Sequence, residues 1–103
     1  MPYNDTYDLQ KVKELLEYFA DEEIIVIAGN LESAKFYWRK IKEYTETDRR
    51  PHIITNHPSS IDGLPFRNSV ILKIGNWWEN RHAPYVIEQG KLANYKLAIT
   101  HLP

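Results

Sequence analysis

Two short apolar runs, each ending in Gly-Asn, constrain the fold of this chain more than any other feature. The first is residues 24–30, Ile-Ile-Val-Ile-Ala-Gly-Asn, and the second is residues 70–76, Val-Ile-Leu-Lys-Ile-Gly-Asn. Continuous rather than alternating apolar residues are typical of strands that are buried on both faces, as in a parallel sheet covered by helices. We therefore predict two central parallel strands that place Asn30 and Asn76 at the same edge of a sheet.

Helical periodicity flanks these two strands. Apolar residues at three- and four-residue spacing predict an N-terminal helix over about residues 6–20 and a second helix over residues 31–44, with Asn30 as its N-cap. Pro84 fits the first turn of a later helix. Two shorter strands and a tail complete the prediction: residues 52–55, residues 96–100 and the tail 101–103.

This alternation of helices and strands predicts an α/β fold with right-handed crossovers. We expect one domain over residues 1–103, built as a small three-layer sandwich. Its mostly parallel four-stranded sheet would have the strand order 2-1-3-4, with helices on both faces. Such a sheet corresponds to half of a Rossmann-like or flavodoxin-like fold.

Composition excludes several classes of protein. The 103 residues carry a net charge of -1, so no overall field attracts the chain to nucleic acid or to an anionic membrane. The absence of cysteine excludes disulfides and thiolate metal sites. No signal peptide pattern is present, and no apolar run approaches the ~20 residues that span a bilayer. We therefore expect a cytoplasmic protein without membrane contact.

The candidate site follows from the predicted topology. In open parallel sheets, ligands bind beyond the carboxyl ends of the strands, where the strand order reverses. We call this predicted edge the carboxyl rim and define it by nine residues: Gly29, Asn30, Asn56, His57, Gly75, Asn76, Trp77, Trp78 and Arg81. An alternative interpretation is that the glycines only permit tight turns and that the asparagines only cap them.

Trp77 and Trp78 are the most unusual local feature of the rim. Adjacent residues in an extended loop point to different sides, so one indole could cover the core while the other faces solvent. An exposed tryptophan on a polar edge is typical of protein interaction hot spots. The alternative is that both rings close the open end of the sheet, because aromatic side chains usually bury most of their area.

Motifs for specific chemistry are missing. The chain contains no phosphate-binding P-loop, no Gly-x-Gly-x-x-Gly after the first strand, and no Gly-x-Ser-x-Gly nucleophile elbow. The four histidines are not at metal-ligand spacing, and no carboxylate pairs with a base in a pattern that indicates acid-base catalysis. We predict no catalytic residue, no metal site and no cofactor, which favours a protein that is not an enzyme.

Residues 24–81 resemble small bacteriophage-encoded proteins that look like truncated Rossmann-like domains. The resemblance depends on the first strand ending in Gly29-Asn30, on the turn at residues 61–64 (Ile-Asp-Gly-Leu), and on Gly75-Asn76-Trp77 after the third strand. Such proteins generally carry no assigned activity, so no functional residue can be carried over. The resemblance implies a viral or mobile-element accessory protein that acts in the cytoplasm of a bacterial host.

Three functional hypotheses remain open at this point. The first is a binding protein for a host or viral macromolecule, most simply another protein, with Trp77 and Trp78 in the contact surface. The second is a nucleotide or nucleotide-signal binding module at the carboxyl rim. The third is nucleic-acid binding through residues 35–50, where nearby acids dilute a local basic concentration formed by Lys35, Arg39, Lys40, Lys42, Arg49 and Arg50. An exposed strand edge or helix face would also permit a homodimer.

Overall fold

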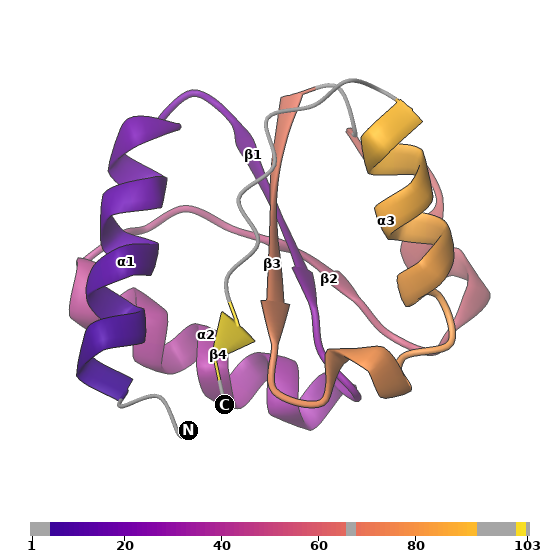
Figure 1. Cartoon of the computed structure of the whole chain (residues 1–103), viewed down its shortest axis with the longest axis horizontal. Coiled ribbons are helices and arrows are strands. Elements are labelled where there is room, and N and C mark those ends of the chain that lie inside the picture. Colours follow the sequence, from indigo (N-terminus) through magenta and orange to yellow (C-terminus); the bar gives the residue numbers. More distant parts are fainter. Residues whose placement is uncertain (1–4, 66–67, 93–100, 103) are drawn as a thin grey trace.

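The computed structural model describes residues 5–65, 68–92 and 101–102, which form a mixed α/β globule around a parallel sheet (Figure 1). Its elements in chain order are α1 (Asp5–Tyr18), β1 (Glu23–Ile27), α2 (Leu31–Thr45), β2 (His52–Ile54), η1 (Pro58–Ile61), β3 (Ser69–Ile74), η3 (Trp77–Glu79), α3 (Ala83–Leu92) and β4 (His101–Leu102). The three predicted helices are confirmed, and their ends lie within a few residues of the predicted positions.

Three strands form the body of the sheet. β1 lies between β2 and β3, and all three run parallel, with Val26 of β1 opposite Ile53 of β2 and Leu72 of β3. The two strands with the longest apolar runs are therefore central neighbours, as predicted. This pairing brings the carboxyl ends of β1, β2 and β3 to one edge of the sheet (Figure 1).

The segment β4 extends the order to β2-β1-β3-β4 through two residues only. His101 and Leu102 pair with Lys73 and Ile74 of β3. The prediction that residues 101–103 form a tail was therefore wrong for these two residues. The strand predicted over residues 96–100 lies outside the described residues.

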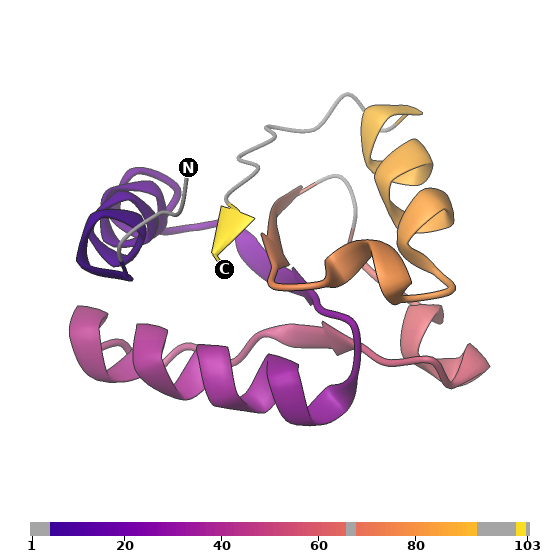
Figure 2. The same ribbon diagram turned by 60° about the horizontal axis from the view of Figure 1, so that its bottom comes forward.

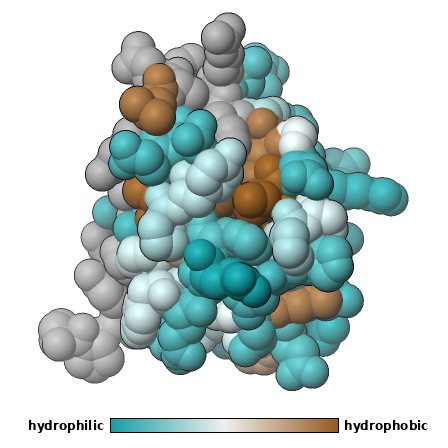
Figure 3. All heavy atoms as spheres, turned by 90° about the vertical axis from the view of Figure 1, so that its right-hand side faces the viewer, coloured by the Kyte–Doolittle hydropathy of each residue, from teal (hydrophilic) through white to brown (hydrophobic). Residues whose placement is uncertain are grey.

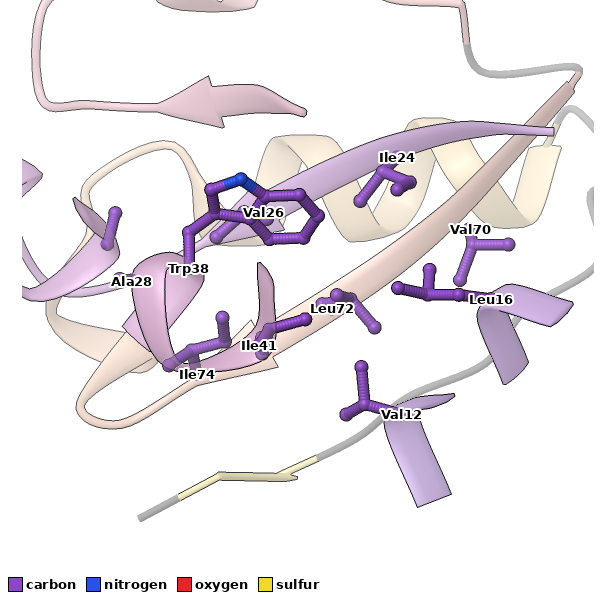
Figure 4. Close-up of a cluster of buried hydrophobic side chains, with 11 residues drawn as sticks. Val12, Leu16, Ile24, Val26, Ala28, Trp38, Ile41, Val70, Leu72 and Ile74 are labelled. Carbon is purple, nitrogen blue, oxygen red and sulfur yellow. The ribbon is translucent and has the colours of Figure 1, made fainter. Parts of the chain in front are cut away.

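Helices cover both faces of the sheet (Figure 2). Alternate residues of a strand point to opposite faces, so each central strand supplies two separate cores. On one face, Val26 and Leu72 pack with Trp38 and Ile41 of α2 and with Leu16 of α1, as Figure 4 shows. The buried members of the core on the other face are Ile25, Ile27, Ile54, Ile71, Ala83 and Val86. The continuous apolar pattern of the strands is explained by this burial on both sides.

Arg49 joins the first helix to the sheet. Its guanidinium group donates hydrogen bonds to the backbone oxygen of Leu16, at 3.2 Å, and to the backbone oxygen of Glu22. Carbonyls at the end of a helix lack partners within the helix and attract cations. The sequence placed Arg49 among the exposed basic residues near α2, but its guanidinium group stabilises the connection between α1 and β1 instead.

Candidate functional site

At the carboxyl rim, two turns lie in close contact where the strand order reverses. The turn after β1 and the turn after β3 touch at this point, because a Cβ atom added to Gly29 would lie 2.9 Å from the backbone oxygen of Asn76. Real Cβ atoms essentially never approach another atom so closely. Gly29 is therefore required for a close approach of two backbones. In many open α/β sheets this position is an open crevice.

Asn30 caps α2, as the sequence predicted. Its backbone is extended, with φ -153° and ψ 172°, and its Oδ1 accepts a hydrogen bond of 2.8 Å from the backbone amide of Ser33. A side-chain oxygen in this position satisfies an amide that has no partner within the helix. The capping interpretation of Asn30 is confirmed.

Asn56 connects two loops of the rim. Its Oδ1 accepts a hydrogen bond of 3.1 Å from the backbone amide of Arg81, and its backbone oxygen lies 3.3 Å from Nε2 of His82. The loop after β2 is thereby held against the segment between η3 and α3. The backbone of Arg81 is fixed by this contact, whereas its side chain is exposed.

His57 serves mainly as the cap of η1. Its Nδ1 accepts a hydrogen bond of 3.2 Å from the backbone amide of Ser59 and lies 2.7 Å from the hydroxyl oxygen of the same residue. A histidine that contacts a serine hydroxyl is one part of a nucleophilic site. However, both residues are exposed, and the described residues around them supply no third group that orients the imidazole ring. The contact between His57 and Ser59 therefore belongs to a local turn.

Asn80 is the residue that sequence reasoning missed. Its side chain is 1% exposed, and Nδ2 donates to the backbone oxygen of Ala28 at 2.9 Å and to that of Ile54 at 2.8 Å. Its Oδ1 accepts from the backbone amide of His82 at 2.9 Å. One amide group therefore ties the ends of β1 and β2 to the start of α3. An asparagine in a polar loop carries no sequence signal for such long-range bonds.

Gly75 and Asn76 form the turn after β3. Gly75 has a φ of +54°, in the left-handed region that favours glycine, and Asn76 has φ -82° and ψ 46°. The backbone oxygen of Asn76 accepts from the amide of Glu79 at 2.9 Å, but its side chain makes no capping hydrogen bond. The exposed amide of Asn76 thus remains available to a partner, unlike the amide oxygen of Asn30.

Trp77 and Trp78 differ in burial, as one of the two interpretations predicted. Trp77 is half-buried and packs against the core on the α3 side of the sheet, whereas Trp78 is 61% exposed. Their rings meet edge to face, with centroids 5.9 Å apart and an interplanar angle of 84°. The ammonium group of Lys73 lies 4.1 Å from the centroid of the Trp77 ring, so a cation contacts the half-buried indole.

The surface on the α3 side of the molecule carries both apolar and polar side chains. Figure 3 shows an apolar patch near the middle of the face that α3 covers, with hydrophilic side chains beside and below it. Tyr85 and Leu92 of α3 are also exposed, by 47% and 71%. Two hollows in the described surface lie elsewhere, one of about 560 Å³ at residues 18–22 and one of about 320 Å³ beside Leu9 and Tyr44.

The outer face of α2 is less basic than its lysines suggest. At helical spacing, Glu32 and Glu43 fall on the same exposed face as Lys35 and Arg39. Phe36, which is 51% exposed, lies on this face with the ammonium group of Lys40 4.8 Å from the centroid of its ring. Acidic side chains within the patch reduce the attraction to phosphate groups.

The described residues contain no group of three or more histidine, aspartate or glutamate side chains that could hold a metal ion. None of the helices in the described ranges is long and apolar enough to cross a membrane. A comparison of the chain with protein-family models, with curated proteins and with solved structures gives no match.

Proposed function

We propose that this chain is a small non-enzymatic binding module that recognises a macromolecule, specifically another protein, through the exposed part of its carboxyl rim. The observation that carries this proposal is Trp78, a large aromatic side chain that is 61% exposed on a well-supported turn. In keeping with the resemblance of residues 24–81, we assign the module to phage accessory proteins that act in the host cytoplasm. Its complete sheet would be the four-stranded half of a Rossmann-like fold.

The exposed side chains of the rim are of the types that protein interfaces use. Tryptophan and arginine are enriched among residues whose truncation costs the most binding energy. Asn76, Trp78 and Arg81 are all exposed, and their side chains make no hydrogen bond within the described part of the chain. The amide of Asn76 and the guanidinium group of Arg81 both have donors to offer to a partner.

The remaining polar groups of the rim favour a protein over a nucleotide. Asn30 and Asn56 use their amide oxygens for bonds to the backbone, and the backbones of Gly29 and Asn76 approach each other closely at the position where a nucleotide would enter. Small ligands are usually held in concave sites that bury most of their surface. A projecting indole fits a pocket in a partner instead.

The test is a capture experiment with matched variants. The immobilised protein is exposed to bacterial lysate and the retained proteins are identified by mass spectrometry. Trp78→Ala is expected to lose a specific partner, because truncating a hot-spot side chain costs about 2 kcal/mol or more, roughly a 30-fold loss of affinity. Phe36→Ala is the control, since Phe36 is similarly exposed but lies on α2. Equal capture by the Trp78 variant would contradict the proposal.

Two further measurements separate the alternatives. Native mass spectrometry of the purified protein reports a second copy, which would make the chain its own partner, or a small molecule that leaves on denaturation. A thermal-shift screen with mono-, di- and cyclic nucleotides reports ligand binding directly, because a ligand at 100 times its Kd stabilises the folded state by about 2.7 kcal/mol. Stabilisation by a nucleotide would replace the protein-binding proposal with the nucleotide hypothesis.

A further inference from the structure

We infer that Lys73 is a positioning residue for the rim: its ammonium group holds Trp77, and Trp77 holds the exposed Trp78 in a fixed orientation. This inference rests on the proposed function, because it explains how a short turn can present a binding residue. The sequence pattern predicted only that Lys73 lies in a strand. A lysine is unexpected in such an apolar strand, because lysine side chains are rarely buried.

The strand pattern explains where Lys73 points. Val70, Leu72 and Ile74 belong to the core on the α1 and α2 side, and Ile71 belongs to the core on the α3 side. Because strand side chains alternate, Lys73 shares the α3 side with Ile71. It is only 8% exposed, so its aliphatic stem is buried near the carboxyl end of β3.

The Lys73 ammonium group and the Trp77 ring make a close cation-π contact, at 4.1 Å between Nζ and the ring centroid. Such contacts fall within ~6 Å and are strongest with tryptophan and when little water is present. Trp77 is itself half-buried against the core on the α3 side. The first indole of the pair is therefore restrained by both apolar packing and contact with a cation.

Trp78 gains its orientation from this arrangement. It packs edge to face against Trp77, with the ring centroids 5.9 Å apart. The turn that carries both indoles is a single 3₁₀ turn of three residues, which has little stability of its own. The residue that follows this turn, Asn80, is fixed by the hydrogen bonds of its buried side-chain amide. A binding side chain that is ordered before contact loses less conformational entropy on association.

The first test needs no partner. Two indoles in this arrangement couple and give an exciton signal in circular dichroism, and Trp78→Phe assigns that signal to the pair. Lys73→Met keeps an unbranched stem but removes the charge, and we expect it to weaken the exciton signal and to increase quenching of tryptophan fluorescence by acrylamide. Lys73→Arg keeps a cation and is expected to restore both. Lys40→Met is the control, because Lys40 lies over the ring of Phe36 on α2.

An unchanged exciton signal and unchanged quenching in Lys73→Met would overturn the inference. So would a loss that Lys73→Arg fails to restore while both variants unfold cooperatively, because Lys73 would then act through something other than its charge. The second test repeats the lysate capture with Lys73→Met, for which we expect a roughly 5- to 30-fold loss in affinity of the Trp78-dependent partner. Retention of that partner at full affinity would also contradict it.

The two proposals fail in different experiments. If Trp78→Ala leaves capture unchanged, the proposed function is wrong, but the exciton signal still reports whether Lys73 orients the two indoles. If Lys73→Met leaves the exciton signal unchanged while Trp78→Ala abolishes capture, the binding surface stands and the positioning role of Lys73 is wrong.

Discussion

The two Gly-Asn turns at the ends of β1 and β3 have the same sequence but different structures. Gly29 is required by space, since a side chain there would meet the backbone oxygen of Asn76 at 2.9 Å. Gly75 is required by backbone conformation, since its φ is +54°. Asn30 caps a helix of fifteen residues, whereas Asn76 precedes a 3₁₀ turn and leaves its side chain exposed.

This difference shows that a repeated dipeptide does not imply a repeated role. The segment after each turn determines the conformation of the turn. After Asn30 comes a long amphipathic helix that needs a cap, and after Asn76 come two tryptophans that pack against each other, the first of which also contacts Lys73. The first turn is a structural support, and the second turn presents exposed groups at the same edge. Substitutions at the two turns should therefore have unequal effects.

The largest effect on stability is expected from substitution of Asn80. This residue follows the second Gly-Asn turn, and its side chain binds the end of β1 just before the first Gly-Asn turn. Asn80→Ala leaves the backbone oxygens of Ala28 and Ile54 without their side-chain donor and creates a small cavity. Buried groups without partners cost about 1–3 kcal/mol each, so we expect a loss of about 2–4 kcal/mol in the free energy of unfolding. Urea denaturation measures it, and a loss below about 1 kcal/mol would show that the amide is dispensable.

The next effect is expected at Gly29. Gly29→Ala forces the turns after β1 and β3 apart, because the obstructing atom is a backbone oxygen that cannot rotate away. Overpacking of this kind costs about 1–3 kcal/mol, and thermal unfolding measures it as a lower Tm. A variant with unchanged stability would mean that the two turns separate easily.

Gly75→Ala is expected to have a smaller effect for a different reason. The left-handed conformation costs an alanine about 1–2 kcal/mol, while the nearest atom to the added Cβ is Cε2 of Tyr37, a side-chain atom at 3.2 Å. Gly75→Asn should be less destabilising than Gly75→Ala, because asparagine tolerates this conformation better. The reverse ranking would indicate that contact with Tyr37, rather than φ, is decisive.

The two asparagines provide the finest comparison. Asn30→Ala removes the bond to the amide of Ser33 and should destabilise the protein by about 1 kcal/mol. Asn76→Ala removes an exposed side chain without a capping bond and should change stability by no more than about 0.5 kcal/mol. Chemical denaturation of both variants in parallel measures the difference. Equal losses would remove the distinction between a supporting and a presenting turn.

The features that the sequence predicted correctly depend on local patterns of residues. The apolar runs predicted β1 and β3 as central parallel neighbours, and helical spacing predicted α1, α2 and α3. The cap at Asn30 was predictable because its partner, Ser33, is only three residues away. The division between Trp77 and Trp78 was predictable as one of two outcomes, since adjacent side chains point in different directions.

Contacts between residues far apart in the chain could not be predicted from the sequence. Asn80 binds backbone oxygens of residues 52 and 26 positions earlier, and Arg49 binds carbonyls near the end of α1. Neither side chain differs in type or spacing from an ordinary loop residue. Which of several polar side chains reaches a buried carbonyl depends on how the elements pack.

The amino-acid sequence by itself determined the three helices, the parallel arrangement of the three main strands and the edge at which their polar ends gather, because periodicity and capping act over a few residues. Tertiary structure alone decided which rim residues support the fold and which face solvent. The physical reason is that a buried amide or ammonium group needs partners, and packing brings those partners from strands and loops far apart in the chain.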